Sequence, residues 1–363
     1  MKVLHVITTL DRGGAENQLL TLAREQVKLN QKVEVVFLKG QAELKPDFEN
    51  SGIDLPINIA NLNPLIQVLK LKRFLSKYDG VIHAHLPRAE LVARVSLKSQ
   101  PFFVSRHYGE RFWPKMPNVF SNILSRFVLH KCKLVIAISH YVEFYLKSSG
   151  ELPVNTKIEV VPYALNKYFD SNGSMPLRDE YLTLIENKFV IGTVSRLSPE
   201  KDLRTFILAI KEVSKRSDKF IGIIIGGGPL DSELKKFVNL NELNEKVVFL
   251  GRTLNVANYM KTFDVFLLTS LFEGFGLVLL EAMSVGLPVI GTKTGSIPEV
   301  IGDSGPGILV EIGDYKGIAK EIFNLSLNQE LVSILSQKGI TRSKDFDAKK
   351  MAEKINYFYE KLV

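Results

Sequence analysis

The sequence is poor in cysteine and contains no long hydrophobic run. Cys132 is the only cysteine among 363 residues, which excludes an intramolecular disulfide and fits a reducing compartment. No motif of a thiol nucleophile surrounds it, so we expect a structural role. No stretch of about 18 apolar residues occurs, and a membrane-spanning helix is not expected. The first residues, MKVLHVITTLDRGG, lack the small residues of a cleavage site and predict a strand rather than a signal peptide.

Acidic residues are scarce relative to basic ones in the first half of the chain. Residues 1–170 contain 23 Lys and Arg against 15 Asp and Glu, whereas residues 171–363 contain 24 of each kind. The formal net charge of +8 therefore belongs to the first half, and residues 64–147 alone hold 14 basic and 4 acidic residues. This imbalance favours an anionic partner such as a nucleic acid, an acidic substrate or a lipid surface. No recognition motif or repeat of aromatic and basic residues supports nucleic acid, which we therefore do not expect as a partner.

Short β-branched runs alternate with helical patterns along the whole chain. The strand-like runs are nearly continuous in apolar residues, which is typical of parallel strands covered by helices on both faces. The pattern occurs twice, and the chain is too long for one ordinary core. We therefore predict an α/β protein of two Rossmann-like, doubly wound parallel-sheet domains that face an interdomain cleft. The predicted parts are a domain at 1–165, a linker at 166–187, a domain at 188–345, and a terminal helix at 346–363 that packs back toward the first domain.

The residues that follow the predicted strands are candidates for ligand contacts. Gly13 and Gly14 stand between a strand and a helix, where they form either a tight turn or a close approach of the backbone to a ligand. Arg196 and Lys201 flank another loop after a strand. They are either solvated charges or two cations that hold a diphosphate. Gly227 belongs to a Gly-Gly-Gly loop that lacks the spacing of a dinucleotide fingerprint, so we interpret it as a close-approach loop lining the cleft.

Two glutamates lie eight residues apart in SLFEGFGLVLLEAMSVGLPVI. Glu273 lies in a glycine-flanked turn, and Glu281 lies inside an apolar segment of helical length. A carboxylate in an apolar helix is costly unless it accepts strong hydrogen bonds. The pair therefore indicates hydroxyl-bearing ligands, with a buried structural Glu281 as the alternative interpretation.

Together these motifs resemble the family 4 retaining glycosyltransferases, which use nucleotide sugars and have the GT-B fold. The resemblance covers almost the whole chain and rests on Gly-Gly-Ala-Glu at 13–16, SRLSPEKD at 195–202, GGGPL at 226–230 and the two glutamates of 273–281. It implies that Arg196 and Lys201 hold the donor diphosphate, that Glu281 accepts the ribose hydroxyls and that Glu273 binds the donor sugar. It further implies donor contacts from Gly13, Gly14, Gly227, Arg252 and Thr253 and from the backbone of Phe275, Gly276 and Leu277. The candidate catalytic residues are His107, Arg196, Lys201 and Glu273.

Histidines and the interdomain turn need separate interpretation. His107 follows the fourth strand, where the family often has a histidine near the reacting sugar, so we expect a hydrogen bond from it to the sugar or the acceptor. His83 and His85 share one strand face, but no third ligand is evident and we expect no metal. Ala164 and Asn166 replace a usual glycine and aspartate of the family, which predicts an altered turn between the domains. The sequence DFD at 345–347 is interpreted as a helix N-cap by Asp347 rather than a metal motif.

The resulting hypothesis is a metal-independent retaining hexosyltransferase without a cofactor. It would use a nucleoside diphosphate sugar, UDP- in preference to GDP-, and a glycan or lipid-linked acceptor in bacterial cell-surface polysaccharide or glycolipid synthesis. We expect a cytoplasmic protein whose basic first domain binds the inner face of the plasma membrane. The alternatives are a nucleotide-sugar 2-epimerase of similar fold and a catalytically silent nucleotide-sugar-binding protein. The motifs do not select the sugar, the acceptor, the linkage or the oligomeric state.

Overall fold

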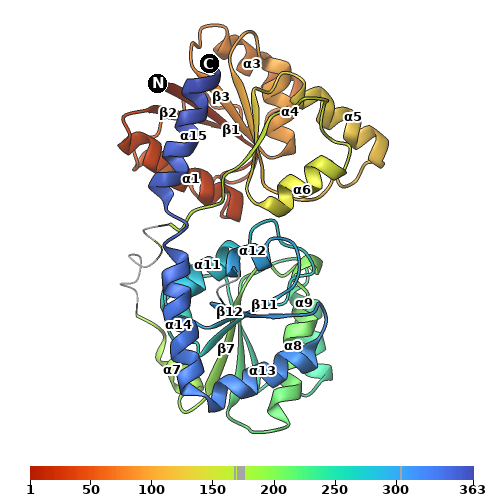
Figure 1. Cartoon of the computed structure of the whole chain (residues 1–363), viewed down its shortest axis with the longest axis vertical. Coiled ribbons are helices and arrows are strands. Elements are labelled where there is room, and N and C mark those ends of the chain that lie inside the picture. The colour runs from red at the N-terminus through yellow and green to blue at the C-terminus, as the bar shows by residue number, and fades with distance from the viewer. Residues whose placement is uncertain (167–168, 170–175, 303–304) are drawn as a thin grey trace. The chain divides into compact units, whose positions relative to one another are not determined.

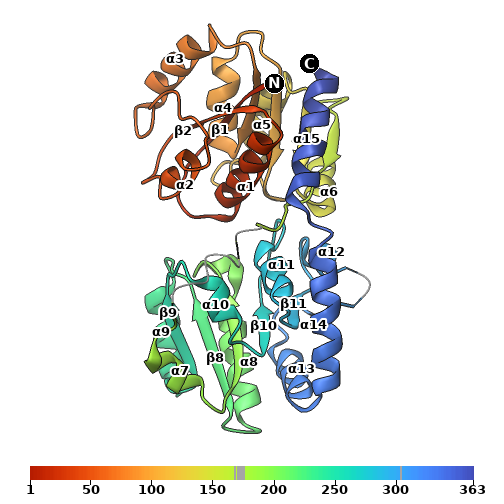
Figure 2. The same cartoon turned by 90° about the vertical axis from the view of Figure 1, so that its left-hand side faces the viewer.

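The structure is a computed structural model that describes residues 1–166, 169, 176–302 and 305–363. The chain forms two compact units. Unit 1 comprises Met1–Asn166 with Phe346–Val363, and unit 2 comprises Lys167–Asp345. In each unit a parallel sheet lies between layers of helices (Figures 1 and 2).

Unit 1 is built on six parallel strands in the order β2-β1-β3-β4-β5-β6. The strands are β1 (Lys2–Ile7), β2 (Lys32–Phe37), β3 (Val81–His85), β4 (Phe102–Arg106), β5 (Leu134–Ala137) and β6 (Ile158–Val160). The helices are α1 (Gly14–Lys28), α2 (Lys45–Glu49), α3 (Pro64–Leu75), α4 (Pro87–Ser96), α5 (Asn118–Leu129), α6 (His140–Ser148) and α15 (Ala348–Leu362). Helices α1 and α15 pack together on one face, and α3 and α4 pack together on the other (Figure 1).

Unit 2 also contains six parallel strands, in the order β12-β11-β10-β7-β8-β9. The strands are β7 (Phe189–Val194), β8 (Phe220–Ile225), β9 (Val247–Gly251), β10 (Val265–Leu268), β11 (Val289–Thr292) and β12 (Gly307–Val310). The helices are α7 (Asp179–Ile185), η1 (Pro199–Lys201), α8 (Leu203–Ser214), α9 (Asp231–Leu240), α10 (Val256–Met260), α11 (Leu277–Ser284), α12 (Ile297–Ile301), α13 (Tyr315–Leu327) and α14 (Gln329–Ser343). Helix α8 packs against α13, and α11 packs against α14.

The strand order of each sheet reverses direction at one place. Counted within unit 2, the order is that of the Rossmann fold, and it reverses between β7 and β10. Unit 1 has the flavodoxin-like order instead, and it reverses between β1 and β3. Ligands of such sheets bind beyond the carboxyl ends of the strands at this switch point. Ligand contacts are therefore expected in the loops that follow β7 and β10 and in those that follow β1 and β3.

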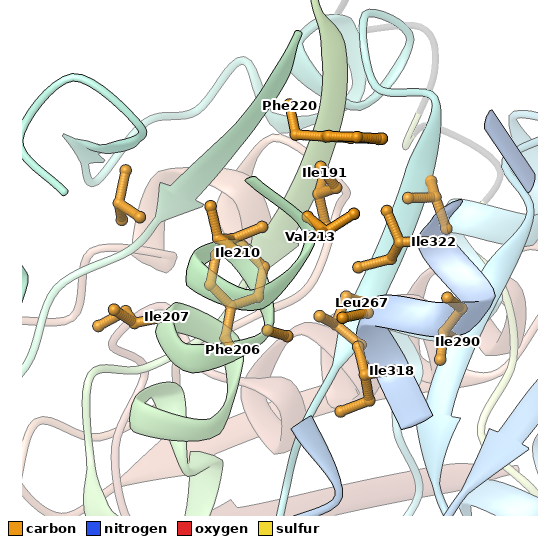
Figure 3. Packing of buried hydrophobic residues seen from close by; sticks show 14 of the residues in the cluster. Ile191, Phe206, Ile207, Ile210, Val213, Phe220, Leu267, Ile290, Ile318 and Ile322 are labelled. Atoms are coloured by element: carbon orange, nitrogen blue, oxygen red, sulfur yellow. The ribbon is translucent and has the colours of Figure 1, made fainter. Parts of the chain in front are cut away.

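The core of unit 2 lies between the sheet and helices α8 and α13. Figure 3 shows Phe206, Ile210 and Val213 of α8 packed with strand residues such as Ile191 and with Ile318 of α13. All five of these side chains are fully buried. This packing explains why the strands of unit 2 are almost continuously apolar, because both faces of the sheet are covered.

Several elements were not predicted from the sequence. The short strands β6 and β12, which complete the two sheets, and helices α2, α13 and α14 were not identified. Part of the predicted linker, residues 179–185, forms helix α7. The buried Tyr181 of this helix shares a hydroxyl–hydroxyl hydrogen bond of 2.6 Å with Thr262. Residues 167, 168 and 170–175 of the predicted linker lie outside the described part.

The last helix closes the core of unit 1. Asp347 accepts a hydrogen bond from the backbone N–H of Lys350 at 2.9 Å, which confirms it as the N-cap of α15. Near this helix the backbone of Ala164 is held on both sides by the Gln18 amide, at 3.0 Å and 2.7 Å. Ala164 is not among the residues with positive φ, so this position does not need the glycine that the family usually has.

Candidate active site

The switch point of unit 2 brings two loops together. The hydroxyl of Thr269, just after β10, donates to the backbone carbonyls of Lys201 and Asp202, at 3.0 Å each. The N–H of Leu271 donates to the carbonyl of Glu200 at 2.8 Å. These bonds tie the loop that follows β10 to the loop that follows β7, so the side chains of both loops have fixed positions relative to each other.

Lys201 and Glu273 form an ion pair at this point. The ammonium Nζ lies 2.6 Å from Oε2 and 2.9 Å from Oε1 of the carboxylate, and the two side chains are 18% and 13% exposed. The family resemblance assigned these residues to the diphosphate and the sugar, and the structure joins them to each other. A lysine held in this way keeps its ammonium positioned and still has donors for a phosphate oxygen.

Helix α11 carries the second glutamate. Its N-cap, Gly276, has a left-handed conformation with φ of 84°, and the first N–H groups of a helix have no partner within the helix. Glu281 lies four residues into α11, half-buried, and burial raises its pKa to about 8. Its carboxylate has no hydrogen-bond or ion-pair partner within residues 1–166, 169, 176–302 and 305–363. A carboxylate in this state favours an incoming hydroxyl donor.

A third loop, which sequence reasoning missed, holds the Glu273 turn. After β11 the hydroxyl of Thr294 donates to the carbonyl of Leu271 at 2.8 Å, and the N–H of Ser296 donates to the carbonyl of Glu273 at 3.1 Å. Gly295 has φ of 54°, and a Cβ on it would lie 2.1 Å from the Glu273 carbonyl. The run of hydroxyl residues and glycine directly after an apolar strand, TKTGS, was the available signal.

The three glycines after β8 allow close packing of two backbone segments. A Cβ on Gly226 would lie 1.9 Å from the Ser195 carbonyl, and one on Gly228 would lie 2.4 Å from the Leu197 carbonyl. The glycines thus let this loop pack against the loop that carries Arg196, which adds a structural reason to the interpretation of a ligand loop. Gly227 would place its Cβ 3.0 Å from the Arg252 side chain.

The remaining cations of this region are exposed. Arg196 and Arg252 both project into solvent, and Thr253 accepts a hydrogen bond from the N–H of Asn255 at 3.0 Å. In the described part of the chain, the guanidinium of Arg196 has neither a hydrogen-bond nor an ion-pair partner. It is therefore available for an anion.

The glycine pair of unit 1 opens helix α1. Gly13 is the N-cap, and a Cβ there would meet the carboxylate of Glu16 at 2.4 Å. Gly14 has no atom within 4 Å of the place where its Cβ would lie, and its φ is not positive. Neither packing nor backbone conformation of this unit requires glycine at position 14. The space beside Gly14 is thus open in unit 1, which is compatible with the predicted close approach of a ligand.

His107 is buried at the end of β4, with 6% of its surface exposed. Its Nε2 lies 3.2 Å from Nδ1 of His85, and its Nδ1 contacts the hydroxyl of Tyr163. Burial and then the charge of Arg106 lower its pKa to about 3, so the ring is neutral. Both ring nitrogens thus have partners within unit 1, so the predicted hydrogen bond from His107 to a sugar or an acceptor would have to replace one of these contacts.

The expectation that no third potential ligand accompanies His83 and His85 is wrong. Strand β1 pairs with β3 in a register that places His5 opposite His83, and ligand atoms of the three rings lie within 4.8 Å of one another. The sequence could not show this because His5 lies 78 residues before His83. Its position depends on the strand order of the folded sheet.

Arg106, which precedes His107, lies in a buried ionic cluster. Its Nε lies 3.0 Å from Glu90 and its Nη1 lies 3.0 Å from Glu151, and the other carboxylate oxygen of Glu151 accepts from the N–H of Phe112 at 2.8 Å. The cluster anchors the loop after β4. Burial raises the pKa of the Cys132 thiol to about 12, so this thiol is not ionised at neutral pH and is a poor nucleophile.

Comparison with known proteins matches each unit to a glycosyltransferase family model. Residues 12–166 match the family model described as Glycosyltransferase Family 4, and residues 179–342 match the model described as Glycosyl transferases group 1. The UDP-Gal:alpha-D-GlcNAc-diphosphoundecaprenol alpha-1,3-galactosyltransferase of Escherichia coli is 27% identical over 320 residues, which cover 84% of this chain and 81% of that protein. The N-acetyl-alpha-D-glucosaminyl L-malate synthase of Bacillus anthracis is 32% identical over 213 residues, 58% of this chain and 54% of that one.

Solved structures agree on the fold. The crystal structure of Anabaena HepE in complex with UDP-glucose has a TM-score of 0.84 at 22% identity and covers 99% of this chain and 100% of its own. Together with the two six-stranded parallel sheets, this similarity confirms the predicted GT-B type of fold. In the described residues, no helix combines the length and the apolar character that a membrane span requires.

Proposed function

This chain belongs to the family 4 glycosyltransferases, and on that premise we propose that it moves a hexose-type sugar from a nucleoside diphosphate sugar to a glycan or lipid-linked acceptor. UDP-sugars are the preferred donors, and the role is in cell-surface polysaccharide or glycolipid synthesis. The observation that carries the proposal is the ion pair of Lys201 with Glu273 at the switch point of unit 2. It combines a cation for phosphate with a carboxylate for sugar hydroxyls.

The proposed reaction is metal-independent and retains the anomeric configuration. The anomeric C–O bond to the diphosphate breaks while the acceptor oxygen forms its bond on the same face, and the acceptor proton passes to an oxygen of the leaving phosphate. Lys201, Arg196 and the N-terminus of α11 would stabilise the departing negative charge. Glu281 would accept the ribose hydroxyls, because its carboxylate has no partner in the described residues and hydrogen bonds from these hydroxyls would favour the ionised form that burial disfavours.

Further donor contacts complete the proposed site. The backbone of Phe275, Gly276 and Leu277 would bind sugar hydroxyls beside Glu273. Arg252 and Thr253 would lie next to the nucleobase. In unit 2, Gly227 would line the site. In unit 1, Gly13 and Gly14 would let the backbone approach a ligand closely. His107 would act on the acceptor side in unit 1.

The test is release of nucleoside diphosphate from a panel of UDP-, GDP- and ADP-sugars in the presence of EDTA. We expect one donor to turn over, and Lys201→Ala and Glu273→Ala each to lower the rate by about 100-fold or more, as for other groups that stabilise charge in a transition state. Lys215→Ala is the matched control, since Lys215 makes a 2.6 Å ion pair with Glu212 in the same unit but is 62% exposed and lies at the end of α8, away from the loops of the site. Proton NMR of the product then reports its anomeric configuration.

The alternatives give different outcomes in this assay. An epimerase would convert the donor sugar without needing an acceptor, and a silent binding protein would bind one donor and release nothing with any acceptor supplied. If no nucleotide sugar bound at all, the assignment of unit 2 as the donor domain would be wrong. Inversion at the anomeric carbon would refute the retaining mechanism alone.

We also propose that unit 1 binds an anionic membrane surface on the inner face of the plasma membrane. Helix α5 exposes a row of apolar side chains, and α3 exposes apolar and basic side chains together. Arg94 of α4 donates to the carbonyl of Phe127 at 3.2 Å, and Ser96 donates to that of Val68 at 3.3 Å, so α4 joins the two helices. The exposed residues are Val119, Phe120, Ile123, Arg126 and Phe127 on α5 and Leu65, Ile66, Leu69, Lys70, Lys72 and Arg73 on α3.

Membrane attachment would suit a lipid-linked acceptor. Apolar side chains gain by insertion into the headgroup region, and each nearby Lys or Arg adds about 1 kcal/mol of attraction to an anionic surface. The basic excess of residues 64–147 lies in this unit.

A further inference from the structure

A chain of buried hydrogen bonds runs through unit 1, from helix α15 to the carboxyl end of β4. Nε2 of His5 lies 2.8 Å from Oε1 of Gln26, and Nδ1 of His5 lies 3.0 Å from Nε2 of His85. Nδ1 of His85 lies 3.2 Å from Nε2 of His107. The full chain, with every member buried, is Asn356, Gln26, His5, His85, His107 and Tyr163.

The rings of this chain are neutral. Burial lowers the pKa of His5 to about 4, opposed by its hydrogen bond to Gln26, and burial lowers the pKa of His107 to about 3. The pKa of His85 is lowered well below its ordinary value by burial and then by the neighbouring histidines. A neutral imidazole has one donor and one acceptor nitrogen, so the hydrogen bond at one nitrogen determines what the other can do.

The order of donors follows from the amide at the inner end. Oε1 of Gln26 can only accept, so Nε2 of His5 donates to it and Nδ1 of His5 must accept from Nε2 of His85. Nδ1 of His85 then accepts from Nε2 of His107, and Nδ1 of His107 accepts from the Tyr163 hydroxyl. Gln26 in turn donates through its Nε2 to Asn356 at 2.9 Å. Every bond from Tyr163 to Asn356 therefore points in one direction.

We propose that Gln26, acting through His5 and His85, fixes the tautomer of His107 with its proton on Nε2 and so orients the Tyr163 hydroxyl at the carboxyl edge of the sheet. Gln26, His5 and His85 are then positioning residues for the transfer reaction, and this role rests on the proposed function. His107 acts through Tyr163 rather than by donating a proton to a sugar. Tyr163 is the group that the chain holds in place for the acceptor side.

The same contacts disfavour a metal centre at His5, His83 and His85. Both nitrogens of His5 and of His85 already have partners in the chain, and His83 is engaged by Tyr359 at Nδ1 and by Ser105 at Nε2, the latter at 2.8 Å. No carboxylate or thiolate joins the three rings among the residues that the structure describes. Binding an ion there would require the hydrogen bonds to break, in a buried region without a compensating negative charge.

The test measures tautomers directly, by long-range ¹⁵N–¹H correlation NMR of the full chain with ¹⁵N-labelled histidine and without substrate. We expect His5, His85 and His107 to be neutral with protonated Nε2 at pH 7. Gln26→Leu removes the acceptor at the inner end and should populate the other tautomer of His107, three residues along the chain. Gln26→Glu keeps an oxygen acceptor and should preserve the wild-type tautomer of His107.

Ser105→Ala is the matched control. It deletes one buried hydroxyl bound to a buried imidazole, but that imidazole is His83, outside the path from Gln26 to His107. It should change the signals of His83 most and should leave His107 in its wild-type tautomer. In the transfer assay, Gln26→Leu should lower kcat by about tenfold without changing KM for the donor, as loss of an orienting partner does elsewhere, whereas Ser105→Ala should not.

Three results would overturn the proposal. They are a proton on Nδ1 of His107 in the wild-type protein, an unchanged His107 tautomer in Gln26→Leu, and one equivalent of tightly bound zinc by elemental analysis. The wild-type spectrum needs neither a variant that folds nor an active enzyme. The failure of this inference is therefore distinguishable from failure of the proposed transferase function, which the donor assay measures.

Discussion

At the scale of single residues, the raised pKa of Glu281 reflects a carboxylate that is desolvated and has no partner in the described residues. Glu281 lies in helix α11 among apolar side chains, and burial raises its pKa from an ordinary 4.5 to about 8. Between these values the folded protein keeps a proton that the unfolded chain has lost. The contribution of this group to stability is therefore present below about pH 4.5 and is lost as the pH rises toward 8. A structural glutamate with hydrogen-bond partners would show the opposite trend.

Replacement of Glu281 by glutamine should separate stability from function. Glu281→Gln removes the charge. We therefore expect the free energy of unfolding of unit 2 to rise by about 1–3 kcal/mol at pH 9 and to depend less on pH. Donor binding should weaken about tenfold, because the amide is a poorer acceptor for two hydroxyls. Calorimetry at pH 5, 7 and 9 and a donor titration measure the two effects.

Glu311→Gln is the control for Glu281→Gln, since that carboxylate is 70% exposed and paired with Lys293. It should change neither the pH profile nor donor affinity. A Glu281→Gln protein that was less stable than wild type at pH 9 would contradict the assignment of an unpartnered buried carboxylate.

At the scale of elements, helix α5 is apolar on its exposed side although its other side is already buried in unit 1. Its Ser121, Ser125 and Val128 are buried against unit 1, while Phe120 and Ile123 are 59% and 58% exposed. A helix of a freely soluble surface would carry polar residues at the latter positions. The exposed apolar row and the basic residues of α3 are what a helix at an anionic bilayer surface presents.

The double substitution Phe120→Ser with Ile123→Ser should abolish much of the membrane affinity. We expect the wild-type chain to co-sediment with vesicles of phosphatidylcholine and phosphatidylglycerol at low salt and to dissociate at high salt. Loss of two large apolar side chains should weaken binding by tenfold or more, on the order of 1.5 kcal/mol or more for each side chain that is fully buried.

Leu240→Ser provides the comparison, because Leu240 is 82% exposed on α9 of the other unit. It should leave sedimentation unchanged. Wild-type protein that stayed in the supernatant at low salt would dismiss the membrane surface, and equal losses in both variants would assign the effect to general hydrophobicity.

At the scale of the whole molecule, the chain returns from unit 2 to complete unit 1. Helix α15 contributes Tyr359 and Ile355 to the core that also contains Val3 and Phe103. The Tyr359 ring lies at 4.9 Å from the Phe103 ring, edge to face. Unit 1 thus depends on residues that are synthesised after all of unit 2.

We predict that Tyr359→Ala destabilises unit 1 by about 3–5 kcal/mol, the usual cost of deleting a buried aromatic side chain. Trp113 is the only tryptophan, so its fluorescence in urea reports unit 1, and binding of the donor reports unit 2. Tyr357→Ala, on the exposed side of the same helix, should change neither signal by more than about 0.5 kcal/mol. An unchanged Trp113 transition in Tyr359→Ala would contradict this dependence.

The features that sequence analysis recovered are local ones. Hydrophobic runs of strand length, helical patterns between them and turn residues at their ends all act over a few residues, so the alternating strands and helices could be predicted. Lys201 and Glu273 were candidates for ligand contacts because each follows a predicted strand, and the family resemblance then assigned both to the donor site. The short strands β6 and β12 were missed because three or four residues carry too little pattern to be distinguished from a loop.

The sequence by itself determined the alternation of strands and helices, the parallel sheets and the loops that carry the candidate ligand-binding residues, because periodicity and turn chemistry are properties of neighbouring residues. Only the tertiary structure decided that Lys201 pairs with Glu273, that Thr294 and Ser296 hold the Glu273 turn and that His5 joins His85 and His107 in one chain. Those contacts depend on which strands lie side by side and in which register. That order is set by the packing of the whole sheet, over separations of about 20 to 80 residues, and no local pattern encodes it.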